Sequence, residues 1–174
     1  MTKNKEDGHG GCAAGQRSEA RLTAACEAAG LRRLHIKEHF KDSIHPYEGT
    51  RRLPKPPRFT LAEKKRTNNF FSDGLVENPN NTSAAIVESR NSDKRGTTEE
   101  KVFFTLEKYR NGVYTKHGDR YPFVMLFQGT QCENVNEYRL FEKIAREEKL
   151  PIHVIFDPTP HLGRFQTVMK KLLA

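Results

Sequence analysis

The sequence is poor in the apolar residues that a folded core requires. Hydrophobic residues make up 35% of the 174 residues and charged residues make up 30%. A typical globular chain is about 45–50% apolar on a count that also includes glycine. Too little apolar material is present to pack the whole length, so we expect part of the chain to be disordered.

Long hydrophobic runs and a disulfide framework are also missing. No stretch approaches the roughly 18 consecutive apolar residues of a membrane-spanning helix, and the polar N-terminal residues do not resemble a secretory signal. The three cysteines, Cys12, Cys26 and Cys132, are odd in number and widely separated, which is typical of reduced thiols in a reducing compartment. We therefore expect an intracellular protein that has no membrane partner.

Basic residues, by contrast, are abundant and concentrated in one place. The formal net charge is +8, and residues 51–66 hold seven bases and one acid, Glu63, which leaves +6 in sixteen residues. The seven bases are Arg51, Arg52, Lys55, Arg58, Lys64, Lys65 and Arg66. Such a patch suits a polyanion, or a receptor that recognises basic tracts. The alternative is a solvated basic linker without a partner.

The spacing inside this basic segment also matches a bipartite nuclear-import signal. Arg51-Arg52 and Lys64-Lys65-Arg66 are separated by eleven residues, which lets two basic clusters reach two acidic pockets of an import receptor. A nuclear location is therefore suspected, with an import receptor as a possible partner.

Two weaker signals accompany the segment. Residues 51–57 contain a basic residue followed by a PxxP pattern, which SH3 domains bind as a preformed polyproline helix. Arg110, Lys116 and Arg120 lie close together in the sequence and form a predicted secondary basic patch that adds to binding of nucleic acid.

The distribution of apolar residues predicts four regions along the chain. Residues 1–16 form a disordered tail, and residues 17–44 form a helical segment with helices at about 18–29 and 31–44. Residues 45–98 are a basic, extended linker, because prolines and asparagines interrupt every period. The composition changes at Lys101, so we predict that residues 99–174 form the compact domain.

The compact domain is predicted to be α/β, with α+β as an alternative, and to contain a small mixed sheet in the order β-β-β-α-β-α. The predicted elements are strands at 102–109, 113–116 and 121–127, a helix ending near 149, a strand at 152–156 and a helix at 161–173. Asn111-Gly112 favours a hairpin between the first two strands. The strand–helix–strand series predicts that 121–127 and 152–156 are parallel.

This element order is similar to the core of many metal-dependent nucleases, which contains three strands, a helix and a strand. Such an enzyme needs an acid on one strand and an acid plus a lysine on the next, to hold Mg²⁺ and to position the attacking water. The strand predicted at 121–127 carries neither an acid nor a lysine, Asp119 lies in the preceding turn, and Glu107-Lys108 lies on the first predicted strand. We therefore predict no metal site there.

Other chemical groups give no stronger prediction. His35 and His39 would share a helix face as zinc-binding pairs do, but thirteen residues separate the upstream Cys12 and Cys26, where a zinc finger needs two to four. Cys132 precedes a predicted helix, where a thiol becomes more reactive, but it has no second cysteine nearby. No metal and no cofactor is predicted.

Asp157 follows a predicted parallel strand, where α/β sheets place functional groups. Its position before Pro158 is explained equally well by a turn, and we favour the turn.

The sequence thus favours a non-enzymatic protein that associates with nucleic acid, RNA rather than DNA, within a ribonucleoprotein. The alternative is a structural or adaptor subunit whose extended arm lies on protein surfaces in a large assembly. An enzyme similar to nucleases or to thioredoxin is less favoured, and no catalytic residue is predicted.

Overall fold

The computed structural model describes residues 10–34, 73–81, 83–93, 101–110 and 121–174. Side chains of residues 10–16 are not described. The basic segment 51–66 and the predicted strand at 113–116 lie outside the described residues, and so do Lys116 and Arg120.

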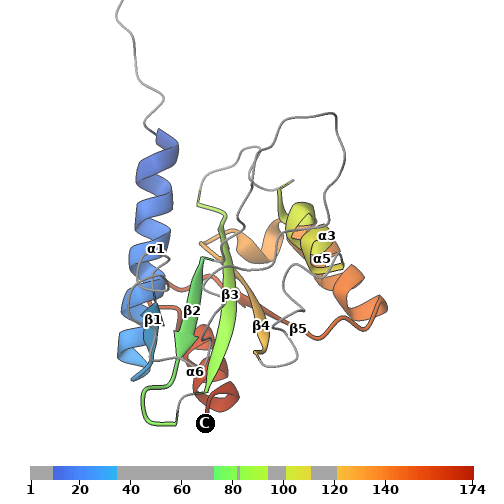
Figure 1. The fold of residues 1–174 in the computed structure, drawn as a ribbon. Helices are drawn as coiled ribbons and strands as arrows, with labels where there is room; N and C mark the ends of the chain where they lie inside the picture. The colour runs from blue at the N-terminus through green and yellow to red at the C-terminus, as the bar shows by residue number, and fades with distance from the viewer. Residues whose placement is uncertain (1–9, 35–72, 82, 94–100, 111–120) are drawn as a thin grey trace, which may run out of the picture.

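A single mixed sheet of five strands organises the described part of the chain (Figure 1). The strands lie in sequence order, and they are β1 (Arg32–Leu34), β2 (Gly74–Glu77), β3 (Ala84–Asn91), β4 (Phe123–Gln128) and β5 (Ile152–Asp157). The β1–β2 and β2–β3 pairs are antiparallel, whereas the β3–β4 and β4–β5 pairs are parallel. The chain is therefore α/β, as the sequence predicts.

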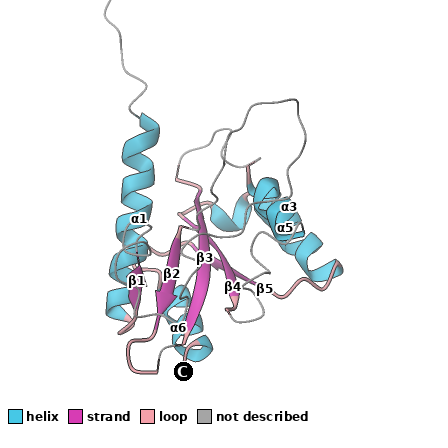
Figure 2. Cartoon of the chain, viewed as in Figure 1, coloured by secondary structure: helices cyan, strands magenta, loops and turns pink. Residues whose placement is uncertain are grey.

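Helices cover both faces of this sheet (Figure 2). The helices are α1 (Gly10–Ala28), α3 (Val102–Arg110), α5 (Asn136–Glu147) and α6 (Gly163–Leu172), with a short 3₁₀ turn η1 (Cys132–Asn134) before α5. Helices α1 and α6 lie on one face, and α3 and α5 lie on the other (Figure 1). No helix among the described residues is long and apolar enough to cross a membrane.

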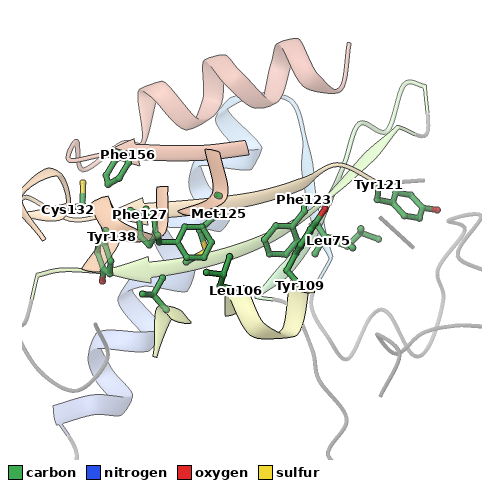
Figure 3. Close-up of a cluster of buried hydrophobic side chains, with 14 of the residues drawn as sticks. Leu75, Leu106, Tyr109, Tyr121, Phe123, Met125, Phe127, Cys132, Tyr138 and Phe156 are labelled. Carbon is green, nitrogen blue, oxygen red and sulfur yellow. The ribbon is translucent and has the colours of Figure 1, made fainter. Parts of the chain in front are cut away.

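The core on the α3–α5 face combines aliphatic side chains with a group of aromatic rings (Figure 3). Phe127 stacks on Tyr138 with ring centroids 4.1 Å apart, and it also contacts Phe141 and Phe156 at 5.6 and 5.2 Å. Rings at these separations contribute beyond the area that they bury. Phe127, next to the last residue of β4, therefore joins β5 and α5 to the sheet through its ring contacts.

The opposite face has a second, mainly aliphatic core. Successive side chains of a strand point to opposite faces of the sheet. The strand residues between those of the first core therefore point into this second core. Its fully buried members include Leu22, Val87, Leu126, Phe165 and Met169. Every residue of β4 is buried, which confirms the prediction of a central strand covered on both faces.

The β2–β3 turn is fastened to the end of α6. Asn78 and Asn81 donate side-chain hydrogen bonds to the carbonyl of Leu173, at 2.8 and 3.0 Å, and the hydroxyl of Ser83 donates a third at 2.8 Å. A helix leaves its last carbonyls without partners inside the helix, and here the turn supplies three donors to one of them. The turn is thereby held at a fixed place on the domain.

Several predicted elements match the structure. The strands predicted at 121–127 and 152–156 are β4 and β5, and they are parallel. The two helices predicted after them are α5 and α6. The helix predicted at 18–29 lies within α1.

The strand predicted at 102–109 is wrong, because this segment is helix α3. Its composition is typical of a strand, yet its buried residues are Val102, Thr105, Leu106 and Tyr109. They are spaced by three and four residues, which is the period of a helix and not of a strand. Packing of that face against α5 and the sheet outweighs the local β-propensity.

The predicted linker and tail also contain regular structure. Strands β2 and β3 lie within residues 45–98, and β1 lies within the predicted helix at 31–44. Helix α1 begins at Gly10, inside the predicted tail. Residue 99 falls between β3 and α3, and β3 is the parallel neighbour of β4. The sheet therefore continues across the predicted domain boundary.

Candidate metal centre

Two carboxylates approach each other where β2 begins. Asp73 immediately precedes β2, and Glu88 lies on β3, its antiparallel neighbour. Gly74 lies opposite Val87 in this pair, so the residue before Gly74 comes next to the residues after Val87. The backbone N–H of Ser89 donates to Oδ2 of Asp73 at 2.7 Å. This bond continues the strand pairing with a side chain and fixes the carboxylate beside β3.

One guanidinium nitrogen lies among three oxygens at this place. Nη1 of Arg90 is 3.4 Å from Oδ2 of Asp73 and 3.6 Å from Oε2 of Glu88. The same nitrogen donates to the backbone carbonyl of Ser89 at 2.8 Å. Two carboxylates and one carbonyl therefore converge on a single cationic nitrogen. We call Asp73, Glu88 and the carbonyl of Ser89 the oxygen cluster.

The cluster lies under helix α3, because β3 alternates its side chains. Glu88 and Arg90 point to the α3–α5 face, as Ile86 does. The hydroxyl of Thr105 on α3 accepts a hydrogen bond from Nη2 of Arg90 at 3.2 Å. The side chain of Glu88 is only 3% exposed, whereas that of Asp73 is 34% exposed. The cluster is thus buried at Glu88 and reached by solvent at Asp73.

A second cation belongs to this cluster. Lys108 follows Thr105 by three residues and so lies on the same face of α3. Burial lowers the pKa of Lys108, and the nearby charge of Arg90 lowers it further, whereas Glu88 and Asp73 act to raise it. The charges of Asp73, Glu88, Arg90 and Lys108 therefore act on one another across the β2–β3–α3 junction.

The other face of β3 is fixed to α1 through Gln128. The amide nitrogen of Gln128 donates to the hydroxyls of Ser89 and Ser18, at 2.6 and 2.8 Å. Ser89 is the residue whose backbone N–H and carbonyl contact Asp73 and Arg90. Its side chain is therefore anchored on the opposite face from the charges that its backbone orients.

Asp157 has a structural role, in agreement with the favoured prediction. Its Oδ1 accepts from the N–H and the hydroxyl of Thr159, at 3.1 and 2.6 Å, which forms a local turn. Its Oδ2 accepts from the N–H of Phe165 in the first turn of α6, at 3.0 Å. The side chain thus makes the turn and caps the helix.

The two described thiols are not suited to catalysis. Burial raises the pKa of the Cys26 thiol to about 12. Burial, followed by the charge of Glu133, raises the pKa of Cys132 to about 11. A reactive cysteine needs a lowered pKa and access to solvent, so the thioredoxin-like alternative has no support at Cys132.

Of the predicted secondary basic patch, the structure describes only Arg110. It ends α3 and pairs with Glu107 on its own helix and with Glu148 beyond α5. The hydrogen bond to Glu148, and then that to Glu107, raise the pKa of Arg110. Arg110 therefore joins α3 to the end of α5 and does not present an unpaired charge.

The oxygen cluster lies outside the segments where the sequence predicts the nuclease-like strands, since it belongs to residues 73–90 and those strands were predicted at 102–127. A related pattern is present, with Asp73 directly before one strand and, after fourteen residues, Glu88-Ser89-Arg90 on the next. It departs from the expected pattern in one residue, since Arg90 stands where a lysine was sought. The signal that could have revealed it is the apolar run at 84–87 directly before Glu88.

No group of three or more His, Cys, Asp or Glu side chains is placed to hold a metal ion within the described ranges. The oxygen cluster has two carboxylates, and its third donor is a backbone carbonyl. Searches against protein-family models, curated proteins and solved structures find no match to this chain.

Proposed function

We propose that this protein binds nucleic acid and cleaves its phosphodiester bonds with a divalent cation held by the oxygen cluster. The observation that carries the proposal is the convergence of Asp73, Glu88 and the carbonyl of Ser89 on one cationic nitrogen. Magnesium and manganese prefer oxygen donors, and Mg²⁺ is usually held by one or two carboxylates while it keeps several waters. The donor set of the cluster matches that preference.

A cation bound here would supply the chemistry that phosphodiester hydrolysis requires, namely activation of water and stabilisation of charge on the phosphoryl oxygens. Asp73, with its partly exposed side chain, faces the solvent from which water and substrate arrive. Glu88 is buried, so its carboxylate holds the inner side of the cluster.

The two basic side chains have a distinct part in this proposal. An arginine side chain donates hydrogen bonds and has no acceptor, so the part of Arg90 is not that of a base. Its planar group can instead donate two hydrogen bonds to a phosphate. Thr105 keeps Nη2 of Arg90 at the site when Nη1 leaves the carboxylates. Lys108 adds a second positive charge for the phosphate backbone.

The preference for nucleic acid rests on the charge of the chain. The net charge is +8, and residues 51–66 carry +6 of it. A concentrated basic segment binds phosphates without regard to sequence. The segment would hold the polymer while the oxygen cluster acts on one phosphodiester.

A second candidate function follows from the same nitrogen. Nη1 of Arg90 already satisfies the three oxygens without a metal. On this alternative the charges only hold β2, β3 and α3 together, and the protein binds nucleic acid without cleaving it. A structural subunit of a larger assembly is the remaining alternative if nucleic acid does not bind.

The test measures cation binding and cleavage together. Mn²⁺ binding is followed by electron paramagnetic resonance, and cleavage is assayed on plasmid DNA and on a mixed-sequence RNA with Mg²⁺ or Mn²⁺. We expect Asp73→Asn and Glu88→Gln to abolish both. Glu147→Gln is the matched control, because it removes an exposed carboxylate on α5 that pairs only weakly with Lys143, at 3.9 Å.

Thermal unfolding without metal shows that each variant is folded. Metal binding that survives both Asp73→Asn and Glu88→Gln would reject the oxygen cluster as the site. Nucleic-acid binding without any cleavage would leave the second candidate function in place.

A further inference from the structure

We infer that Arg33 is a positioning residue that holds Asp73 in the orientation needed for cation binding. The inference rests on the proposed function. It gives a role to Arg33, a buried arginine on β1. Its guanidinium contacts the backbone carbonyl of Asp73 and not the carboxylate. Arg33 acts through the backbone of Asp73.

The guanidinium of Arg33 joins three parts of the chain. Its Nε donates to the backbone carbonyl of Asp73 at 3.1 Å, and Nη2 donates to the same oxygen. Its Nη1 donates to the carbonyl of Glu19 and to the hydroxyl of Thr23 on α1, at 3.2 and 3.0 Å. The peptide group after Asp73 is therefore held against α1 by a rigid fork of donors.

The burial of Arg33 is unusual for a charged residue. Its side chain is 2% exposed, and within the described residues it pairs with the carboxylate of Glu19, with Nη2 and Oε2 3.9 Å apart. Burying a charge is unfavourable unless hydrogen bonds and an opposite charge compensate for it. Four hydrogen bonds satisfy the guanidinium here, and two of them go to one carbonyl. The arrangement therefore favours a geometric role at that carbonyl.

Gly74 makes this contact possible. A Cβ atom at Gly74 would lie 3.0 Å from Nε and 3.2 Å from Cγ of Arg33, closer than ordinary van der Waals contact. The residue after Asp73 must therefore be small for the guanidinium to reach the carbonyl. Gly74 directly after Asp73 and Arg33 on the neighbouring strand β1 are therefore matched in size at this contact.

Both ends of Asp73 are restrained as a result. Arg33 fixes its carbonyl from the α1 side, and the N–H of Ser89 fixes its carboxylate beside β3. Asp73 precedes β2 and is outside the strand pairing of Gly74 to Glu77. These contacts replace the ladder hydrogen bonds that orient a residue within a strand. Loss of the carbonyl contact should let the carboxylate turn away from Glu88.

The test measures the dissociation constant for Mn²⁺ by electron paramagnetic resonance on the full chain, with cleavage rate as a second readout. Arg33→Met should weaken Mn²⁺ binding by about 10- to 100-fold, the usual effect of removing a group that orients a metal ligand. The Mn²⁺ affinity of Arg33→Lys should fall between that of Arg33→Met and that of the unmodified protein. An ammonium can donate to the carbonyl, but it lacks the planar pair of donors of a guanidinium. Gly74→Ala, which keeps Arg33 but crowds it, should weaken binding in the same direction.

Arg32→Met is the matched control, because Arg32 is the adjacent residue of β1, its side chain is 47% exposed, and it pairs with Glu77 instead. All measurements are made at a temperature where circular dichroism shows each variant to be folded. If Arg33→Met does not fold, Arg33→Lys and Gly74→Ala decide the outcome.

Asp73→Asn separates this inference from the proposed function. Unchanged Mn²⁺ binding in Asp73→Asn would reject the metal site itself. Loss of binding in Asp73→Asn, together with unchanged binding in the folded Arg33 and Gly74 variants, would overturn only the positioning role.

Discussion

The antiparallel and parallel halves of the sheet differ in what they bury. In β1, β2 and β3 the buried residues include three charged side chains, Arg33, Glu77 and Glu88. In β4 and β5 the buried polar residues are Gln128 and Asp157, and both are the last residues of their strands. The interior of β4 is entirely apolar.

This difference separates apolar burial from buried charge within one sheet. Buried apolar area is the main source of folding free energy, and the aromatic core around β4 supplies it. Buried charges are costly and need exact partners. Of the four buried charged residues on the described strands, Arg33, Glu77 and Glu88 lie on β1, β2 and β3, and Asp157 ends β5. The parallel half thus supplies most of the apolar burial around β4, and the antiparallel half holds most of the buried charge.

The largest expected effect comes from dividing the two halves. A fragment of residues 99–174 contains β4 and β5 but lacks β3. Every residue of β4 pairs with a residue of β3. The fragment would expose both the edge of β4 and the apolar faces that β3 and α1 cover. We expect no cooperative unfolding transition by circular dichroism, whereas a fragment that begins at Gly10 should unfold cooperatively. A stable, cooperative 99–174 fragment would show that the halves are independent.

Within the parallel half, Phe127→Ala should cause the largest loss from a single substitution. Phe127 is fully buried and contacts three other rings, so the loss should be about 3–5 kcal/mol in the free energy of unfolding. Phe104→Ala is the control, because Phe104 is 67% exposed, and its effect should stay within about 0.5 kcal/mol. Denaturant titration measures both, and equal losses would mean that the aromatic core is misplaced.

Within the antiparallel half, Arg90→Gln should change affinity and catalysis in opposite directions. Removing the guanidinium from the oxygen cluster leaves two carboxylates without their shared cation, so Mn²⁺ should bind several-fold more tightly. Cleavage should slow by about 10²-fold, because a donor to the phosphoryl oxygens is lost. Weaker Mn²⁺ binding in this variant would mean that Arg90 supports the cluster and does not compete for it.

The smallest expected effect concerns two buried thiols, Cys26 on α1 and Cys132 in η1. The raised pKa values of Cys26 and Cys132, about 12 and about 11, keep both thiols protonated at pH 8. Neither should react with iodoacetamide in the native protein, as mass spectrometry of peptides can show, and both should react in urea. Since their folded pKa values exceed the ordinary value of 9.0, their contribution to stability is full below pH 9 and declines above it. Rapid native labelling of Cys132 would reopen the question of its reactivity.

The parallel half could be predicted from sequence because its signals are local. The apolar run at β4 and the stripe of Tyr138, Phe141 and Ala145 on α5 occur within single elements. Helix α3 was mistaken for a strand because Val102, Phe103 and Phe104 have strand-like composition, while the spacing of its buried residues is helical. Local composition and tertiary packing disagree there, and packing prevails.

Only part of the oxygen cluster could be predicted in the same way. The apolar run at 84–87 indicates a buried strand that leads to Glu88, but the approach of Asp73 to Glu88 exists only after strand pairing. Strand β2 has four residues, too few to show a period, and nothing near Asp73 in the sequence identifies its partner. Asp73 and Glu88 become neighbours through the register of β2 on β3. The hydrogen bonds from Arg33 to the carbonyl of Asp73 join residues that are 40 positions apart. They therefore depend on the completed fold.

The fastening of the β2–β3 turn to Leu173 has a consequence for the order of events during synthesis. The turn connects β2 to β3, yet the carbonyl of Leu173 that accepts from Ser83 lies 90 positions further along the chain. At about 5–20 residues per second, a ribosome needs roughly 5–18 s to make that stretch. During this interval the segment with Asp73 and Glu88 has been made without its anchor, so a nascent chain should hold the oxygen cluster in its final place only after α6 is made.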